Sequence, residues 1–215
     1  MNSLNSSQFE YSGAFACVTN GAPYQLIEGN KIHKTAIINW NYVKIGVGNI
    51  FGPNCIIGED AQHGIMSTSG KVHIGNNNIF REFSCVNRPT TLSEATVVGD
   101  RNYFMTSSMV HHDCIIENDV TLCSNAALGG GVTVMNGANL GMNCSVHQFQ
   151  VIGSYSIIGM NSCVIKKSRV LPGRKHAGTP VKEIGINSIG LKRLNITPEK
   201  LKSEEQRFRS LIKRN

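Results

Sequence analysis

Apolar side chains recur at every sixth position over a long central stretch of the chain. From residue 98 to residue 170, thirteen consecutive positions spaced six apart are all apolar, and the residue four places after each is usually small. A helix repeats every 3.6 residues and a strand every two, so neither element alone produces this pattern. The thirteen positions are Val98, Phe104, Val110, Ile116, Leu122, Leu128, Val134, Leu140, Val146, Ile152, Ile158, Val164 and Val170.

A period of six predicts a prism of short strands, in which each hexapeptide forms one face and its apolar residue points inward. Three hexapeptides make one coil of 18 residues, and successive coils stack at the ~4.8 Å spacing of a sheet. Gly and Asn supply the backbone angles that the corners need. The pattern breaks near residues 63–73 and 87–97, which we expect to leave the prism as loops.

The repeat divides the chain into three parts. Residues 1–31 precede the first coil and are expected to form a small N-terminal cap, residues 32–186 form the prism, and residues 187–215 form a helical tail. Within the tail, Thr197 is a candidate N-cap and Pro198 the first helical residue of a short C-terminal helix. Its apolar face is expected to hold Leu201, Phe208, Leu211 and Ile212.

The composition agrees with such a prism. Of the 215 residues, 22 are Gly and only 16% are charged, against the ~25% that is usual in globular proteins. Cys55, Cys114 and Cys144 occupy the small inward position, so we expect packed thiols rather than metal ligands or nucleophiles. The sequence shows no apolar run of the ~18 residues that a membrane span needs and no signal peptide. We therefore expect a cytoplasmic protein with no membrane span, whose seven Cys residues are reduced.

The positive charge is concentrated at the C-terminal end. The formal net charge is +7, but residues 166–215 hold 14 Lys and Arg against four Asp and Glu, whereas the rest of the chain is slightly acidic. Such a basic tail suits an anionic partner: a phosphate-bearing cofactor, an acidic carrier protein or nucleic acid, unless it is only a solvated surface. Nucleic acid is not expected, because Phe208 is the only aromatic residue of the tail and no nucleic-acid motif is present.

The 18-residue coil places two histidine columns side by side. His111 is expected to stack on Gly129 and His147, and His112 on Gly130 and Gln148. A histidine can accept a proton near neutral pH, and the N–H of an uncrowded glycine one coil away can stabilise an oxyanion. Both functions serve acyl transfer from a thioester. Asp113 follows His112 directly, but neighbours on a strand point to opposite faces, so its pairing with the same imidazole stays open.

Five motifs resemble, in the same order, those of the bacterial UDP-N-acetylglucosamine acyltransferase family. They are VHHDC (110–114), LGGGV (128–132), VHQF (146–149), HAGTP (176–180) and NSIGLKR (187–193). The hexapeptide pattern over residues 32–180 likewise resembles the acyltransferases that fold as a left-handed parallel β-helix, an all-β fold. That resemblance implies a homotrimer with active sites in the clefts between neighbouring subunits.

The resemblance also implies roles for the matching residues. His112 falls on the catalytic base and Gly130 on the residue whose amide polarises the thioester carbonyl. His147 and Gln148 fall on substrate-contacting positions, and we add the neighbouring His111 to that set. His176 falls near the end of the acyl chain, while Asn187 and Arg193 fall on nucleotide-binding positions.

Several residues that the family would use are replaced in this chain. Met109 and Gly131 stand where further active-site histidines are expected, and Leu194 stands where a second arginine is expected. The substrate-binding aspartate of the first loop has no counterpart around Gln62-His63-Gly64. An amine needs less help from a base than a hydroxyl does, and the reduced histidine set resembles that of related β-helix enzymes that N-acylate nucleotide-linked amino-deoxy sugars. That resemblance implies N-acylation of such a sugar, of the dTDP-4-amino-4,6-dideoxyglucose type. The acyl donor is expected to be acyl-CoA carrying a short or 3-hydroxylated chain, with acyl-carrier protein as a second possibility.

Further contacts are expected from two segments. The segment 81–94 is expected at the cleft, with Ser84, Asn87, Arg88 and Glu94 as candidate substrate-binding residues. In the basic region, the donor's phosphates are expected to bind Lys166, Lys167, Arg174 and Lys182.

Three other functions stay open at this point. The first is O-acylation of UDP-N-acetylglucosamine from acyl-carrier protein at the start of lipid A synthesis. The second is a zinc carbonic anhydrase on the same fold, which is disfavoured because His111 and His112 are neighbours that point to opposite faces; we therefore expect no metal. The third is a scaffold without catalytic activity.

Overall fold

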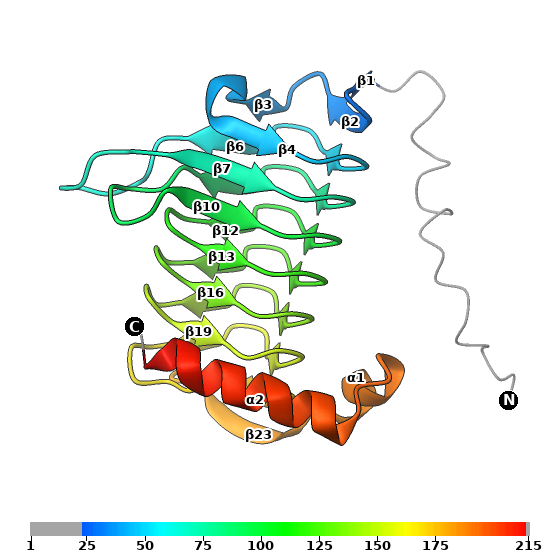
Figure 1. The fold of residues 1–215 in the computed structure, drawn as a ribbon, viewed down its shortest axis with the longest axis vertical. Helices are drawn as coiled ribbons and strands as arrows, with labels where there is room; N and C mark the ends of the chain where they lie inside the picture. The colour runs from blue at the N-terminus through cyan, green and yellow to red at the C-terminus, as the bar shows by residue number, and fades with distance from the viewer. Residues whose placement is uncertain (1–22, 214–215) are drawn as a thin grey trace, which may run out of the picture.

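The computed structural model describes residues 23–213 and confirms the all-β prediction: the chain is a left-handed parallel β-helix (Figure 1). Its three sheets, which we call A, B and C, form the faces of a prism. Each coil adds one short strand to each sheet in that order, and most strands are only two residues long. Two helices lie across the C-terminal end of the prism.

The strands are distributed over the sheets as follows. Sheet A contains β1 (Tyr24–Ile27), β2 (Asn30–His33), β5 (Ile50–Phe51), β8 (Ile79–Phe80), β11 (Tyr103–Phe104), β14 (Thr121–Leu122), β17 (Asn139–Leu140), β20 (Ile157–Ile158), β22 (Arg174–Ala177) and β23 (Lys182–Ile186). Sheet B contains β3 (Ile37–Ile38), β6 (Ile56–Glu59), β9 (Cys85–Asn87), β12 (Met109–Val110), β15 (Ala127–Leu128), β18 (Ser145–Val146) and β21 (Cys163–Val164). Sheet C contains β4 (Val43–Ile45), β7 (Lys71–Ile74), β10 (Ala95–Val98), β13 (Ile115–Ile116), β16 (Thr133–Val134) and β19 (Val151–Ile152).

The predicted register of 18 residues is confirmed in the central coils. Tyr103 pairs with Thr121 in sheet A, and Met109 pairs with Ala127 in sheet B. Two insertions interrupt the register, both where the chain passes from sheet B to sheet C: loop 60–70 between β6 and β7, and loop 88–94 between β9 and β10. The loops predicted over residues 63–73 and 87–97 therefore extend too far, because their last residues already pair as strands β7 and β10.

The inward apolar residues form one continuous core along the prism axis. In sheet A the rings of Phe51, Phe80 and Phe104 lie parallel, with centroids 4.9 and 4.6 Å apart. The predicted packing of the cysteines is also confirmed, since Cys55, Cys114 and Cys144 are buried. Burial raises the pKa of the Cys114 thiol to about 12, so this residue is a small apolar filler rather than a nucleophile.

An asparagine ladder lines the corner between sheets C and A. The side-chain oxygens of Asn30, Asn49, Asn78 and Asn102 each accept the backbone N–H one coil further on. The amide nitrogen of Asn78 also donates to the oxygen of Asn49 and to the carbonyl of Gly99. Asn49, Asn78 and Asn102 take the inward position four places after an apolar anchor, where other coils carry a small residue. An asparagine at this position satisfies buried backbone groups of the corner.

The two ends of the prism are closed differently. At the N-terminal end β1 pairs antiparallel with β2, and the short 3-10 helix η2 (Trp40–Tyr42) follows β3. Most of the predicted cap, residues 1–22, lies outside the described residues. At the C-terminal end β22 and β23 form an antiparallel hairpin. Helix α1 (Ser188–Arg193) follows, and then helix α2 (Pro198–Ile212).

Helix α2 begins as the sequence predicts. The side chain of Thr197 accepts the N–H of Lys200, and Pro198 is the first helical residue. Phe208 packs against Met135 and Val151 at the end of sheet C. Buried Glu204 accepts from Ser154 and pairs with Lys200 and Arg207, which fixes the helix to the last coils. Among the described residues, no helix is long and apolar enough to cross a bilayer.

The asparagine ladder yields a stability prediction. Asn78→Ala leaves the buried N–H of Asn102 and the carbonyl of Gly99 without partners, so we expect the free energy of unfolding to fall by about 1–3 kcal/mol. The measurement is urea denaturation at equilibrium. The matched control is Asn41→Ala, an exposed position in η2, where we expect a change within about 0.5 kcal/mol. Equal stability of the two variants would show that the ladder does not hold the corner together.

Candidate active site

The candidate catalytic and binding residues lie at one edge of the prism, the corner between sheets B and C. Residues 111–114 turn this corner after β12, residues 129–132 do so one coil later, and residues 147–150 two coils later. Loops 60–70 and 88–94 leave the prism at the same corner in earlier coils. The helix geometry therefore stacks five segments that are far apart in sequence along one edge.

Both predicted histidine columns are confirmed by the strand register. Val110 pairs with Leu128, which pairs with Val146, so the residues that follow stack as His111–Gly129–His147 and His112–Gly130–Gln148. The ring of His112 lies directly over Gly130: a Cβ built on Gly130 would be 2.1 Å from Cε1 of the ring. Glycine is required at residue 130 because any side chain there would occupy the space of the imidazole.

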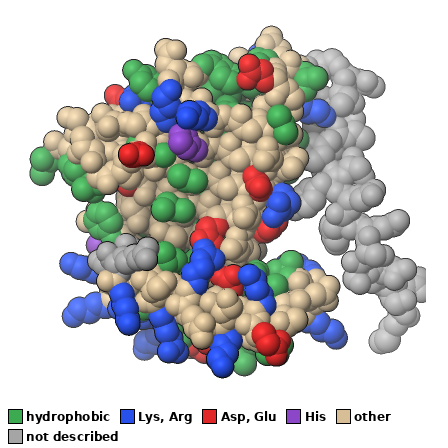
Figure 2. Space-filling model, in the orientation of Figure 1, with side chains coloured by type: hydrophobic (Ala, Val, Ile, Leu, Met, Phe, Trp, Pro, Cys, Tyr) green, Lys and Arg blue, Asp and Glu red, His purple; other side chains and the backbone are tan. Residues whose placement is uncertain are grey.

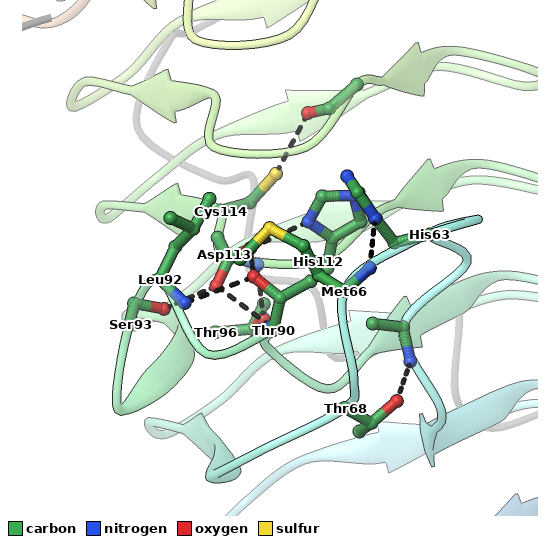
Figure 3. A network of polar contacts seen from close by, with 12 residues as sticks. His63, Met66, Thr68, Thr90, Leu92, Ser93, Thr96, His112, Asp113 and Cys114 are labelled. Atoms are coloured by element: carbon green, nitrogen blue, oxygen red, sulfur yellow. Dashed lines mark hydrogen bonds and ion pairs between the residues drawn. The ribbon is translucent and has the colours of Figure 1, made fainter.

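His112 and Asp113 form a buried pair. Nδ1 of His112 lies 2.7 Å from Oδ2 of Asp113, and the side chains are 7% and 5% exposed (Figure 3). The sequence left this contact open because neighbouring residues of a strand point to opposite faces. That alternation does not apply to Asp113, which is a corner residue with φ of +62°. The left-handed backbone turns its carboxylate back towards the preceding imidazole.

Loop 88–94 holds the carboxylate of Asp113 in place. Oδ1 accepts the backbone N–H of Thr90 at 3.0 Å and the hydroxyl of Ser93 at 2.7 Å, and Oδ2 accepts the hydroxyl of Thr90 at 2.7 Å. Burial alone would raise the pKa of Asp113, but the hydrogen bonds from Ser93, Thr90 and His112 outweigh it and lower that pKa. The aspartate is therefore an anion that accepts from His112.

This charge state sets the tautomer of His112. A carboxylate only accepts, so Nδ1 of His112 carries the proton and Nε2 keeps its lone pair. Beneath the ring, the N–H of Gly130 donates to no acceptor within residues 23–213. A fixed base nitrogen and a free amide N–H one coil apart are the two groups that acyl transfer from a thioester requires.

Thr90 and Ser93 were not identified from the sequence. They lie in segment 81–94, which the sequence predicts at the cleft, and in the structure their side chains hold Asp113. The side chain of Arg88 donates to Asp60 and Gly70, and its guanidinium lies over the ring of Tyr42. Loop 88–94 is thus tied both to Asp113 and to loop 60–70.

The other predicted contacts from segment 81–94 do not converge on His112. Ser84 is 1% exposed and its hydroxyl donates to the carbonyl of Arg81, so the prediction that it binds substrate is wrong: its inward position puts it in the core. Asn87 is also buried and donates to the carbonyl of Asp60. Glu94 is exposed, and its carbonyl accepts the N–H of Lys71. The Glu94 side chain stays a prediction.

The next coils add a pocket at the same corner. It measures about 410 Å³ and is bounded by the corner residues of two coils and the end of α2. We call it the corner pocket; its lining includes His147, Gln148, Phe149, Lys166, Arg169 and Phe208. The structure therefore brings three predicted contacts, His147, Gln148 and Lys166, to one place.

His111 is half-buried beside His112, and burial followed by the proximity of His112 lowers its pKa.

The remaining basic residues are spread over the C-terminal end. Figure 2 shows Lys and Arg side chains gathered around α2. Lys167 and Lys182 are exposed, whereas Arg174 pairs with Glu183. His176 is 2% exposed, and burial lowers its pKa. Its Nε2 accepts the N–H of Leu171, so its ring belongs to the core rather than to an open acyl groove.

The two predicted nucleotide contacts lie on another face. Asn187 caps α1: its side chain accepts the N–H of Gly190 and donates to the carbonyl of Tyr155. With both polar atoms used inside the chain, Asn187 holds the turn that presents Arg193. Arg193 itself is exposed and lines a pocket of about 710 Å³ on sheet A, with Tyr103 and Thr121.

Among residues 23–213, no three His, Cys, Asp or Glu side chains are grouped so as to hold a metal ion. His111, His112 and His147 occupy two separate columns, and Nδ1 of His112 already bonds Asp113. The imidazoles therefore do not converge as a zinc site requires.

Comparison with known proteins identifies the fold and the family of this chain. No family model matches the chain. The UDP-N-acetylglucosamine acyltransferase of Bacteroides fragilis has a solved structure that superposes with a TM-score of 0.75 at 30% identity, over 84% of this chain and 70% of that one. The chain belongs to the UDP-N-acetylglucosamine acyltransferase family of hexapeptide-repeat proteins. The enzyme of Francisella novicida is similar, with a TM-score of 0.66 and 26% identity over 85% of this chain and 78% of that one.

Curated relatives in the family agree. An acyl-[acyl-carrier-protein]–UDP-N-acetylglucosamine O-acyltransferase of Alkalilimnicola ehrlichii is 37% identical over 144 residues, which cover 66% of this chain and 55% of that protein. A protein of the same name from Synechocystis is 34% identical over 172 residues, which cover 79% and 61%. The chain thus spans less than two thirds of the length of these relatives.

These names overturn the predicted acceptor. We expected an amino sugar because several family residues are replaced, but the relatives at 31–37% identity are named as O-acyltransferases. They also name acyl-carrier protein, not the expected acyl-CoA. The replaced residues misled because His112 and its carboxylate partner, Asp113, still form a hydrogen-bonded pair in the structure.

The His112–Asp113 pair generates a prediction. Asp113→Asn keeps the shape of the side chain but removes the charge and places an amide against Nδ1, so we expect kcat for acyl transfer to fall about 10²- to 10⁴-fold. Substrate binding should change little. The measurement is steady-state thiol release, with Glu28→Gln, an exposed carboxylate remote from the corner, as the control. A loss of less than twofold in kcat would contradict the assignment.

The same variant changes the pH dependence of stability. Because the pKa of Asp113 is lowered in the folded protein, its ionised form stabilises the fold above the usual pKa of about 4, and this contribution is lost as pH falls through the lowered value. We expect the stability difference between the native protein and Asp113→Asn to be largest above about pH 4 and to shrink below it, as measured by urea denaturation. A difference that does not change with pH would contradict the lowered pKa.

Proposed function

We propose that this chain transfers an acyl group from an acyl-carrier-protein thioester to a hydroxyl group of UDP-N-acetylglucosamine. The observation that carries the proposal is the buried His112–Asp113 pair over the free N–H of Gly130. The names of the relatives supply the donor and the acceptor. The basic C-terminal end suits both an acidic carrier protein and a nucleotide diphosphate.

In the proposed reaction His112 acts as a base and then as an acid. Nε2 of His112 takes the hydroxyl proton as the acceptor oxygen forms a bond to the thioester carbonyl carbon. Asp113 stabilises the resulting imidazolium through Nδ1, and the N–H of Gly130 donates to the oxyanion. The tetrahedral intermediate then breaks its C–S bond, and the sulfur leaves as a thiol with the proton returned by His112.

The corner between sheets B and C offers a surface along which the acyl donor can lie. From His112 it runs over Gly129–Gly131, which present no side chains, to the corner pocket with Lys166 and Arg169. We propose that the thioester end lies at His112 and the phosphate-bearing end at these two cations. Phe149 borders the path, since a Cβ on Gly131 would be 2.4 Å from its ring.

The nucleotide side of the proposed site requires a second subunit. Arg193 lines a pocket on sheet A, whereas His112 lies at the corner between sheets B and C, across the prism. One chain cannot bring both residues to a single small substrate. We therefore propose a homotrimer in which His112 of one protomer and Arg193 of its neighbour share each of the three sites.

The proposed activity is tested with the purified protein. We expect thiol release from acyl-carrier-protein thioesters, with and without a 3-hydroxyl group, only when UDP-N-acetylglucosamine is present. His112→Ala should lower kcat by about 10²- to 10⁴-fold, whereas His73→Ala, on β7 of sheet C, should retain it. The absence of release from every thioester, or release that does not depend on the nucleotide sugar, would overturn the proposal.

The shared site predicts complementation between inactive variants. His112→Ala and Arg193→Ala, each inactive alone, are co-expressed in equal amounts so that mixed trimers form. An intact site then arises where an unaltered His112 faces an unaltered Arg193, which random assembly produces in about a quarter of the sites. We expect about that fraction of native activity. If both residues act within one protomer, the mixture stays inactive.

A further inference from the structure

His63 lies against the proposed base. It belongs to loop 60–70, and its ring centroid is 5.3 Å from that of His112, with the ring planes at 81° (Figure 3). The sequence offered no signal for this contact, because His63 is 49 residues from His112 and lies where the six-residue repeat is interrupted.

Hydrogen bonds fix the tautomer of His63. Its Nδ1 accepts the backbone N–H of Ile65 at 3.2 Å and that of Met66 at 2.8 Å. An accepting Nδ1 has no proton, so the neutral ring carries its proton on Nε2. Protonating Nδ1 would break both hydrogen bonds and set three N–H groups against one another. Nδ1 of His63 is therefore already used as an acceptor, and only Nε2 of this ring can donate.

Loop 60–70 is fastened to the loop that holds Asp113. The N–H of Ser69 donates to the carbonyl of Pro89 at 2.9 Å, and Thr68 forms a bridge with Thr90. Thr90 in turn donates twice to Asp113. His63 is thus held at His112 by the same connections that orient the carboxylate.

These contacts enclose His112 from several directions. Asp113 binds Nδ1, and Gly130 of the next coil lies beneath the ring. His63, from loop 60–70, contacts the side of the His112 ring, and His111 precedes His112 in the chain. Among residues 23–213, Asp113 and His63 contact the ring of His112, His111 interacts with it electrostatically, and the next coil contributes Gly130.

We propose that His63 is a positioning residue for His112. Its ring confines the imidazole of His112 to the orientation that directs Nε2 outward, while Nδ1 of His63 accepts two backbone N–H groups of its own loop. This role rests on the proposed function, in which His112 is the base. It acts through His112 and not through contact with the reacting atoms.

Two substitutions test the role. His63→Ala removes the ring, and we expect kcat to fall about 10- to 100-fold with KM for both substrates within twofold. His63→Lys adds a fixed charge at the same place. We expect the acid limb of the kcat profile to move to lower pH by about half to one unit, because a cation beside His112 disfavours its protonated form.

The deciding measurement needs no substrate. The imidazole signal of His112 is followed by NMR against pH in the full-length protein, and its midpoint should move down in His63→Lys by the same half to one unit. His33→Lys, which adds the same charge on sheet A, should leave it unchanged. Circular dichroism and urea denaturation establish that each variant is folded.

The outcomes separate this role from the proposed function. A His112 midpoint that is the same in the native protein and in folded His63→Lys would overturn the positioning role, as would a native kcat in His63→Ala. A shifted midpoint in a protein without acyl-transfer activity would support the contact between the rings while rejecting the proposed function.

Discussion

The hydrogen-bonded register between coils decides which side chains can meet in this protein. Each strand pairs with a strand 18 residues later in the central coils, so a corner residue has its spatial neighbours one full coil away. Single strands of two residues would not be stable alone; the parallel ladders and the apolar axis stabilise them jointly. Because the core fixes the register, it also places His112 over Gly130.

The same register explains what could be predicted from the sequence. The prism of short strands, the 18-residue stacking and the columns of His111 and His112 follow from the period of six, since any corner residue is located once its coil position is known. The left-handed form of the prism is what the family resemblance implied. The inward Cys residues follow for the same reason. Ser84 obeys this rule too, because the six-residue pattern puts it at an inward position, which is buried. A substrate-binding role for Ser84 is incompatible with that position.

Other parts of the site could not be predicted because they depend on geometry that the period does not describe. Asp113 reaches His112 only through its left-handed backbone conformation, whereas strand alternation suggests that the two side chains diverge. Thr90, Ser93 and His63 lie in insertions, where the repeat gives no position. Their contacts depend on how two loops pair with each other, and the β-bridge between Thr68 and Thr90 has no signature in either segment.

Whether a hydroxyl or an amine is the acceptor also depends on local geometry that the six-residue period does not describe. Met109 and Gly131 replace histidines that the family would use, which suggested weakened base catalysis. Yet the strength of a histidine base depends on its tautomer, its orientation and a partner for its positive charge, more than on the number of imidazoles nearby. Here Asp113 provides the partner and loop 88–94 fixes it with three donated hydrogen bonds.

Gly131 itself adopts φ of +70° with the ring of Phe149 against it, so a histidine at this position would be strained. The replacement at residue 131 is therefore explained by the backbone and by Phe149, and it carries no information about the acceptor.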